Sequence, residues 1–163
     1  MFSQEEKVVY PGHGVARICR VIEKNVGGQV SRFFELRFLN KDMVILVPVD
    51  NAESLGIRRL ASRKNVNDVL SHLGRPFEPA CVDPAASNWN KRNKEYQGRI
   101  RSGDLRQIGE IYRSLKFISQ RKELSFGEKK LLSQTETLLA EEIALVKNVV
   151  RERATQELRS IVK

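Results

Sequence analysis

The sequence has few of the residues on which most catalytic and metal sites depend. Among its 163 residues are only two cysteines and two histidines. Cys19 and Cys81 lie far apart and form no pair with zinc-ligand spacing, so we expect no metal and reduced thiols in a cytoplasmic protein. His13 and His72 are equally isolated, and each is predicted to be a turn or surface residue.

Signals for secretion, membrane insertion and catalysis are also missing. The first residues lack the cationic start and apolar core of a signal peptide, and the longest uncharged apolar run, residues 43–49, is too short to cross a bilayer. The segment Gly12-His13-Gly14 is not followed by the Gly-Lys-Ser/Thr of a phosphate-binding loop, which favours a hairpin turn. No serine or cysteine nucleophile stands in a recognisable signature. We therefore expect no membrane partner, no cofactor and no enzymatic activity.

Positive charge, in contrast, is abundant and uneven. The chain has 29 basic and 20 acidic residues, with a pI of about 9.8. Residues 1–60 hold nine basic and seven acidic side chains, whereas residues 61–163 hold 20 and 13. A basic surface can simply keep a protein in solution, but this excess favours a polyanionic partner for the second half.

Residue patterns divide the chain into a β half and a helical half. Short runs of β-branched and alternating residues, broken by Pro11-Gly12 and Gly27-Gly28, predict four or five antiparallel strands. From about residue 62 the apolar spacing becomes helical, with Asp104 as a predicted N-cap and Ser125–Glu128 as a predicted capping box. The predicted fold is α+β: a small antiparallel barrel of the Tudor or SH3 type over residues 1–60, followed by a compact all-α domain over residues 64–163.

Residues 87–101 contain the only tryptophan, Trp89, together with five basic side chains and one acidic side chain. Ser87 or Asn88 could cap a helix that runs to Gly103. At 100° per residue, Tyr96 and Ile100 fall on the Trp89 side of that helix, which favours a core tryptophan. Cations and free N–H groups beside the start of a helix favour instead a phosphate-binding role. Residue patterns alone leave the two readings open.

Several motifs along the chain resemble those of the CarD/CdnL family of bacterial transcription regulators. The N-terminal ones are Val8-Val9-Tyr10-Pro11-Gly12-His13-Gly14, Val47-Pro48 and Gly56-Ile57-Arg58. The helical half has Asn88-Trp89-Asn90-Lys91-Arg92-Asn93-Lys94 and Leu124-Ser125-Phe126-Gly127-Glu128-Lys129-Lys130. Their order and spacing are intact over nearly the whole chain, so no single motif has to support the resemblance.

The resemblance implies two partners. In that family the Tudor-like domain binds the RNA polymerase β subunit, in the manner of transcription-repair coupling factor, and the helical domain reaches the upstream edge of the promoter bubble. It implies that Trp89 enters the minor groove as a wedge and that the backbone contacts are Lys91, Arg92, Lys94 and Lys129. It also implies that the strands facing polymerase carry Lys24, Val26 and Leu46.

We therefore expect a monomeric, non-enzymatic regulator that bridges polymerase and promoter DNA and stabilises the open complex with little sequence specificity. An RNA- or ribosome-binding adaptor is the alternative, because such adaptors also combine small β-barrels with basic helices. An enzyme comes third.

Overall fold

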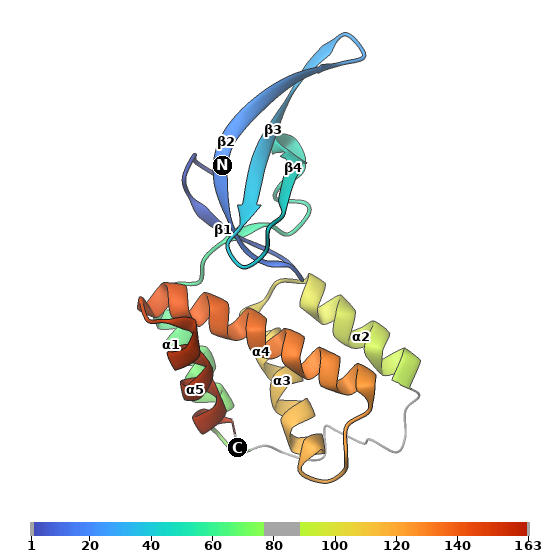
Figure 1. Ribbon diagram of the computed structural model, residues 1–163, viewed down its shortest axis with the longest axis vertical. Coiled ribbons are helices and arrows are strands. Elements are labelled where there is room, and N and C mark those ends of the chain that lie inside the picture. The colour runs from blue at the N-terminus through green and yellow to red at the C-terminus, as the bar shows by residue number, and fades with distance from the viewer. Residues whose placement is uncertain (1, 77–88, 163) are drawn as a thin grey trace. The chain divides into compact units, whose positions relative to one another are not determined.

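The structure is a computed structural model in which residues 2–76 and 89–162 are described. It consists of two compact units, residues 1–60 and 61–163. The first unit is an antiparallel sheet and the second is helical (Figure 1). The predicted α+β fold class is therefore confirmed.

The sheet of the first unit has five strands in the order β4-β3-β2-β1-β5, with antiparallel pairing between neighbours. The strands are β1 (Lys7–Tyr10), β2 (Gly14–Val26), β3 (Gln29–Phe38), β4 (Val44–Pro48) and β5 (Arg58–Arg59), and a short 3-10 helix, η1 (Val49–Asn51), follows β4. Tyr10 pairs with Gly14, so the chain turns at residues 11–13 and the hairpin predicted at Gly12-His13-Gly14 is present.

One face of the sheet holds the core of this unit. The predicted alternation on β3 is confirmed, because Phe34, Leu36 and Phe38 are all buried. A β-bulge interrupts the pairing of β2 with β3: Ile18 pairs with Leu36, Arg20 pairs with Glu35, and Cys19 is the extra residue. Such a bulge shifts the alternation of the strand by one position.

The β2–β3 hairpin projects beyond the rest of the sheet (Figure 1). Its two-residue turn is Gly27-Gly28, with φ of +60° and +85°, the conformation that a tight hairpin requires and that glycine adopts without strain. The pairing of β3 with β4 begins at Phe33 and Pro48, so the residues nearer the turn form a two-stranded arm. Val26 and Val30 on this arm are 61% and 65% exposed.

The second unit contains α1 (Arg63–Leu73), α2 (Trp89–Arg101), α3 (Leu105–Ser119), α4 (Phe126–Lys147) and α5 (Arg151–Ile161). The Asp104 carboxylate accepts a hydrogen bond from the Arg106 N–H, and the predicted Ser125–Glu128 capping box is present, so both predicted caps are confirmed. Ser87 and Asn88 lie outside the described residues. The last helix begins three residues before the predicted start at Ala154.

Two apolar clusters hold the helices together. The larger joins α1, α3, α4 and α5, and the smaller joins α2 to α3 and α4 through Tyr96, Ile100, Ile111, Leu115 and Leu131. Within the described ranges, no helix is both long and apolar enough to span a bilayer.

Candidate nucleic-acid interface

Trp89 is the first residue of α2 and is partly buried. It packs against the smaller cluster together with Tyr96 and Ile100, which confirms that these three residues share one side of the helix. The indole also lies against Gly127 at the start of α4: a Cβ added to Gly127 would stand 2.9 Å from Trp89 Cζ2 and 3.0 Å from Nε1. Trp89 is thus neither a fully buried core residue nor a free one.

The three basic residues that follow Trp89 have different surroundings. The side chains of Lys91 and Lys94 are exposed. The Arg92 side chain is only 12% exposed, and its Cζ lies 5.6 Å from the centroid of the Trp89 ring and 5.8 Å from that of Tyr96. Arg92 therefore lies on the tryptophan side of α2, and it could reach a phosphate only by leaving that position.

The start of α4 contributes the fourth predicted cation. Lys129 is 60% exposed, and its Nζ lies 3.7 Å from an oxygen of the exposed Glu123. An ion pair so open to water contributes little, so Lys129 remains available to a phosphate. Since Trp89 rests on Gly127, the structure brings the first turns of α2 and α4 together. Lys91 and Lys94 are on the side of α2 roughly opposite Trp89, and Lys129 is in the first turn of α4.

Glu128 is the acidic residue at the centre of this arrangement. Its side chain is 3% exposed, Oε1 accepts hydrogen bonds from the Ser125 N–H at 3.0 Å and from Lys122 Nζ at 3.2 Å, and Oε2 lies 3.7 Å from Arg92 Nη2. Burial by itself would raise the pKa of Glu128, but the hydrogen bonds from Ser125 and Lys122 hold it below the ordinary value of 4.5. A buried carboxylate therefore joins the N-cap of α4 to Lys122 and Arg92.

Sequence reasoning missed two features of this site. Phe126, the residue before Gly127, is a large apolar side chain that is 84% exposed. The helical period could have indicated it, because Phe126 falls opposite Leu131 and Leu139 around α4. The second feature is the position of Arg92 against the Trp89 and Tyr96 rings. The spacing could have indicated it, because a residue three after Trp89 and four before Tyr96 lies on the same side of a helix.

In the sheet unit, the predicted polymerase-binding residues share one face. Leu46 pairs with Glu35, which pairs with Arg20, and from Arg20 the alternation of β2 brings Lys24 and Val26 to the same face. This is the face opposite the buried Phe34 and Leu36. Leu46 is 38% exposed and Val26 61%. The six steps from Arg20 to Val26 span about 20 Å along the strand, so the shared face is long.

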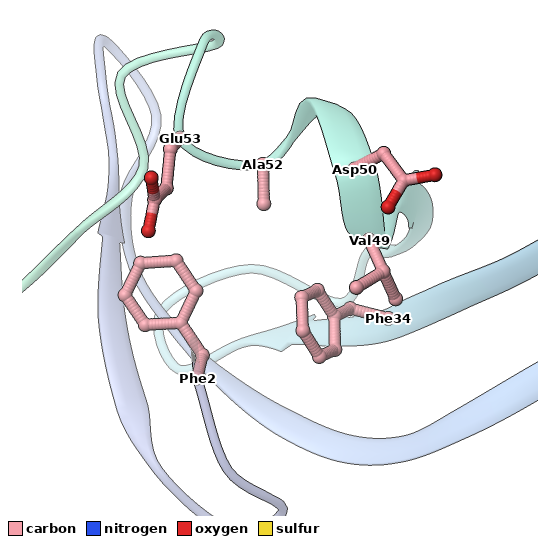
Figure 2. Close-up of a pocket in the computed structure, with 6 residues that line it drawn as sticks. All are labelled: Phe2, Phe34, Val49, Asp50, Ala52 and Glu53. Carbon is pink, nitrogen blue, oxygen red and sulfur yellow. The ribbon is translucent and has the colours of Figure 1, made fainter.

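The same unit has a pocket of about 200 Å³ lined by Phe2, Phe34, Val49, Asp50, Ala52 and Glu53. In Figure 2, the Glu53 carboxylate reaches toward the Phe2 ring, whereas the Asp50 carboxylate points away from the aromatic rings. Ligand pockets are usually larger. The described part of the chain contains no cluster of three histidine, cysteine or acidic side chains that could hold a metal ion.

Comparisons with known proteins match both units. Residues 2–61 match the profile of the family described as "CarD-like/TRCF RID domain", and residues 78–159 match that of "CarD, C-terminal domain". The chain is also 25% identical over 155 residues to "Putative transcription factor YdeB" of Bacillus subtilis, which covers 94% of this chain and 97% of the relative.

Proposed function

The chain belongs to the CarD family of transcription factors, and from this premise we propose that it bridges bacterial RNA polymerase and promoter DNA and stabilises the open complex. The sheet unit would bind the β subunit, and the helical unit would contact the upstream edge of the bubble. Both partners belong to the bacterial cytoplasm, where the protein would be associated with the nucleoid through polymerase.

The observation that supports the DNA contact most strongly is the seating of Trp89 on Gly127. An indole held by α4 loses little conformational freedom when it enters a groove, so more of the contact energy is available for binding. A wedge must offset an unstacking cost of a few kcal/mol per base step. A ring fixed before binding meets that cost better than a freely rotating one. The exposed Phe126, next to Gly127 in the chain, would add apolar area.

The exposed lysines Lys91, Lys94 and Lys129 would supply the remaining affinity. Their ammonium groups fit phosphates and carry no base code, so binding would weaken as salt rises and would depend little on sequence. Promoter choice would then come mainly from polymerase. We propose that Arg92, the remaining predicted cation, supports this interface through contacts within the protein.

On the polymerase side, we propose that the contact is the outer face of β2 and β4, with Lys24, Val26 and Leu46. The match of residues 2–61 to a domain shared with transcription-repair coupling factor supports this unit as the polymerase-binding one. Exposed apolar side chains beside a lysine suit a contact that buries a small apolar centre within a polar rim.

The test uses the full chain with two candidate partners. The tagged protein is incubated with purified bacterial RNA polymerase and, separately, with ribosomes, and promoter complexes formed with and without it are challenged with heparin. We expect co-purification with polymerase and a longer lifetime of the open complex. If the protein bound ribosomes and not polymerase, this proposal would be wrong, and the alternative function of an RNA- or ribosome-binding adaptor would be favoured.

A further inference from the structure

Arg92 makes its contacts inside the protein. Its guanidinium carbon lies within 6 Å of the ring centroids of both Trp89 and Tyr96, in the range of cation–π attraction. Only 12% of its side chain is exposed. A planar guanidinium can stack on aromatic rings and reach a carboxylate at the same time, which a lysine ammonium cannot do.

The two oxygens of the Glu128 carboxylate have different partners. Oε1 accepts hydrogen bonds from the Ser125 N–H, which caps α4, and from Lys122 Nζ. Oε2 faces Arg92 Nη2 at 3.7 Å, and these two atoms are both buried and make no hydrogen bond within the described residues. The interaction between these two atoms is therefore their mutual charge attraction.

This pairing decides between two roles for Arg92. If its guanidinium moved to a DNA phosphate, Oε2 would remain buried with no partner among the described residues, and Lys122 on Oε1 would be the cation left beside the carboxylate. Removing one member of a buried charge pair is unfavourable. If Arg92 stays, it links the first turn of α2 to the N-cap of α4. Trp89 lies between these two turns.

We propose that Arg92 is a positioning residue for Trp89, which fixes the indole through Glu128 and Tyr96, and that it is not a phosphate contact. This inference rests on the proposed function, in which Trp89 meets DNA. Lys91, Lys94 and Lys129 then bind phosphates, while Arg92 sets the direction in which the ring is presented.

Trp89 is the only tryptophan, so its fluorescence reports this position directly in the free protein. Arg92→Gln is compared with Lys91→Gln, which removes the same charge from the same helix. We expect Arg92→Gln to increase acrylamide quenching of Trp89 and to shift its emission to the red, with Lys91→Gln unchanged. Glu128→Gln should act like Arg92→Gln, and the double variant should add little, since both act through one contact.

The same variants are then titrated with duplex DNA over a range of salt concentrations. The salt slope should fall by about one for Lys91→Gln, as for the loss of one phosphate contact, and stay unchanged for Arg92→Gln. A slope lowered by about one in Arg92→Gln, or quenching left unchanged by it, would overturn the proposal. If Arg92→Gln fails to fold, Arg92→Lys and Glu128→Gln replace it. Glutamine at position 128 can still close the capping box of α4.

The two proposals can fail separately. If Lys91→Gln and the wild type bind DNA with equal slopes, or neither binds, the proposed DNA contact is wrong. The fluorescence comparison needs no DNA and would still decide whether Arg92 fixes the indole.

Discussion

The indole of Trp89 lies directly on the backbone of Gly127, so closely that a methyl group on Gly127 would stand 2.9 Å from Cζ2. These two residues are 38 positions apart and come from the first turns of α2 and α4. The contact explains why the α4 motif contains a glycine where a helix would otherwise prefer alanine.

Gly127→Ala should therefore displace Trp89. We expect its fluorescence emission and acrylamide quenching to change and promoter opening to weaken, because the ring must move away from the added methyl group. The matched control is Gly98→Ala on α2, where a Cβ would meet no atom within 4 Å. That change should stabilise the fold by about 0.5–1 kcal/mol and leave the fluorescence as it is. Unaltered fluorescence in Gly127→Ala would contradict the observed contact.

Trp89→Ala should separate stability from promoter opening. Since the ring is only partly buried, the loss in free energy of unfolding should be below the roughly 3–5 kcal/mol that follows removal of a fully buried aromatic residue. Polymerase binding should persist, while the open-complex lifetime falls by the equivalent of about 1–3 kcal/mol, the usual contribution of an aromatic–base contact. Thermal melting and a heparin challenge measure the two effects. If cooling or excess protein restored promoter opening, the ring would be serving the fold alone.

Replacing Lys91, Lys94 and Lys129 together by glutamine should flatten the salt dependence of DNA binding. Three lost phosphate contacts lower the slope by roughly two to three units. The matched control removes three exposed cations of α1 and α5, Lys64, Arg151 and Arg153, and should leave the slope near that of the wild type. Equal slopes for both triple variants would mean that the lysines of α2 and α4 form only a solvated surface.

Val26→Glu should weaken polymerase binding, because a charge forced into a partly dehydrated contact costs at least a few kcal/mol. Val30→Glu is the control. Val30 is equally exposed on the same hairpin, but it pairs with Asn25 and points to the opposite face. Binding to immobilised polymerase should fall for Val26→Glu only. A greater loss for Val30→Glu would place the contact on the other face.

The stability of the helical unit should depend on Glu136 at acid pH. Burial favours its protonated form, but hydrogen bonds from Arg159 at 2.7 Å and from the buried Tyr112 hydroxyl at 2.8 Å hold the pKa of Glu136 below 4.5. The stabilisation is thus complete above pH 4.5 and is lost as the pH falls through the lower value in the folded protein.

Glu136→Gln should therefore cost about 1–2 kcal/mol of unfolding free energy at pH 7, with a difference from the wild type that shrinks as the pH is lowered. Urea unfolding at several pH values measures it. If the difference in unfolding free energy stayed constant with pH, the charge of the Glu136 carboxylate would not contribute to stability.

Local rules predicted much of this protein. Helix periodicity placed Tyr96 and Ile100 beside Trp89, and the Ser125–Glu128 motif predicted its own cap, because these features depend on residues within one or two turns of each other. The order of a β unit and a helical unit followed from the change in apolar period near residue 60.

Only the tertiary structure decided which way the decisive side chains face. Arg92 is predicted among the phosphate contacts, and local spacing already places it on the Trp89 side of α2. Its buried contact with Glu128, a residue of another helix, follows from no local pattern. In the sheet, the bulge at Cys19 likewise decides which side chains share a face. Without that extra residue, strict alternation from Ile18 would place Lys24 and Val26 on the core face, opposite Leu46. Composition and local order thus determined the fold class and the charge, whereas contacts between distant segments determined which residues share a surface.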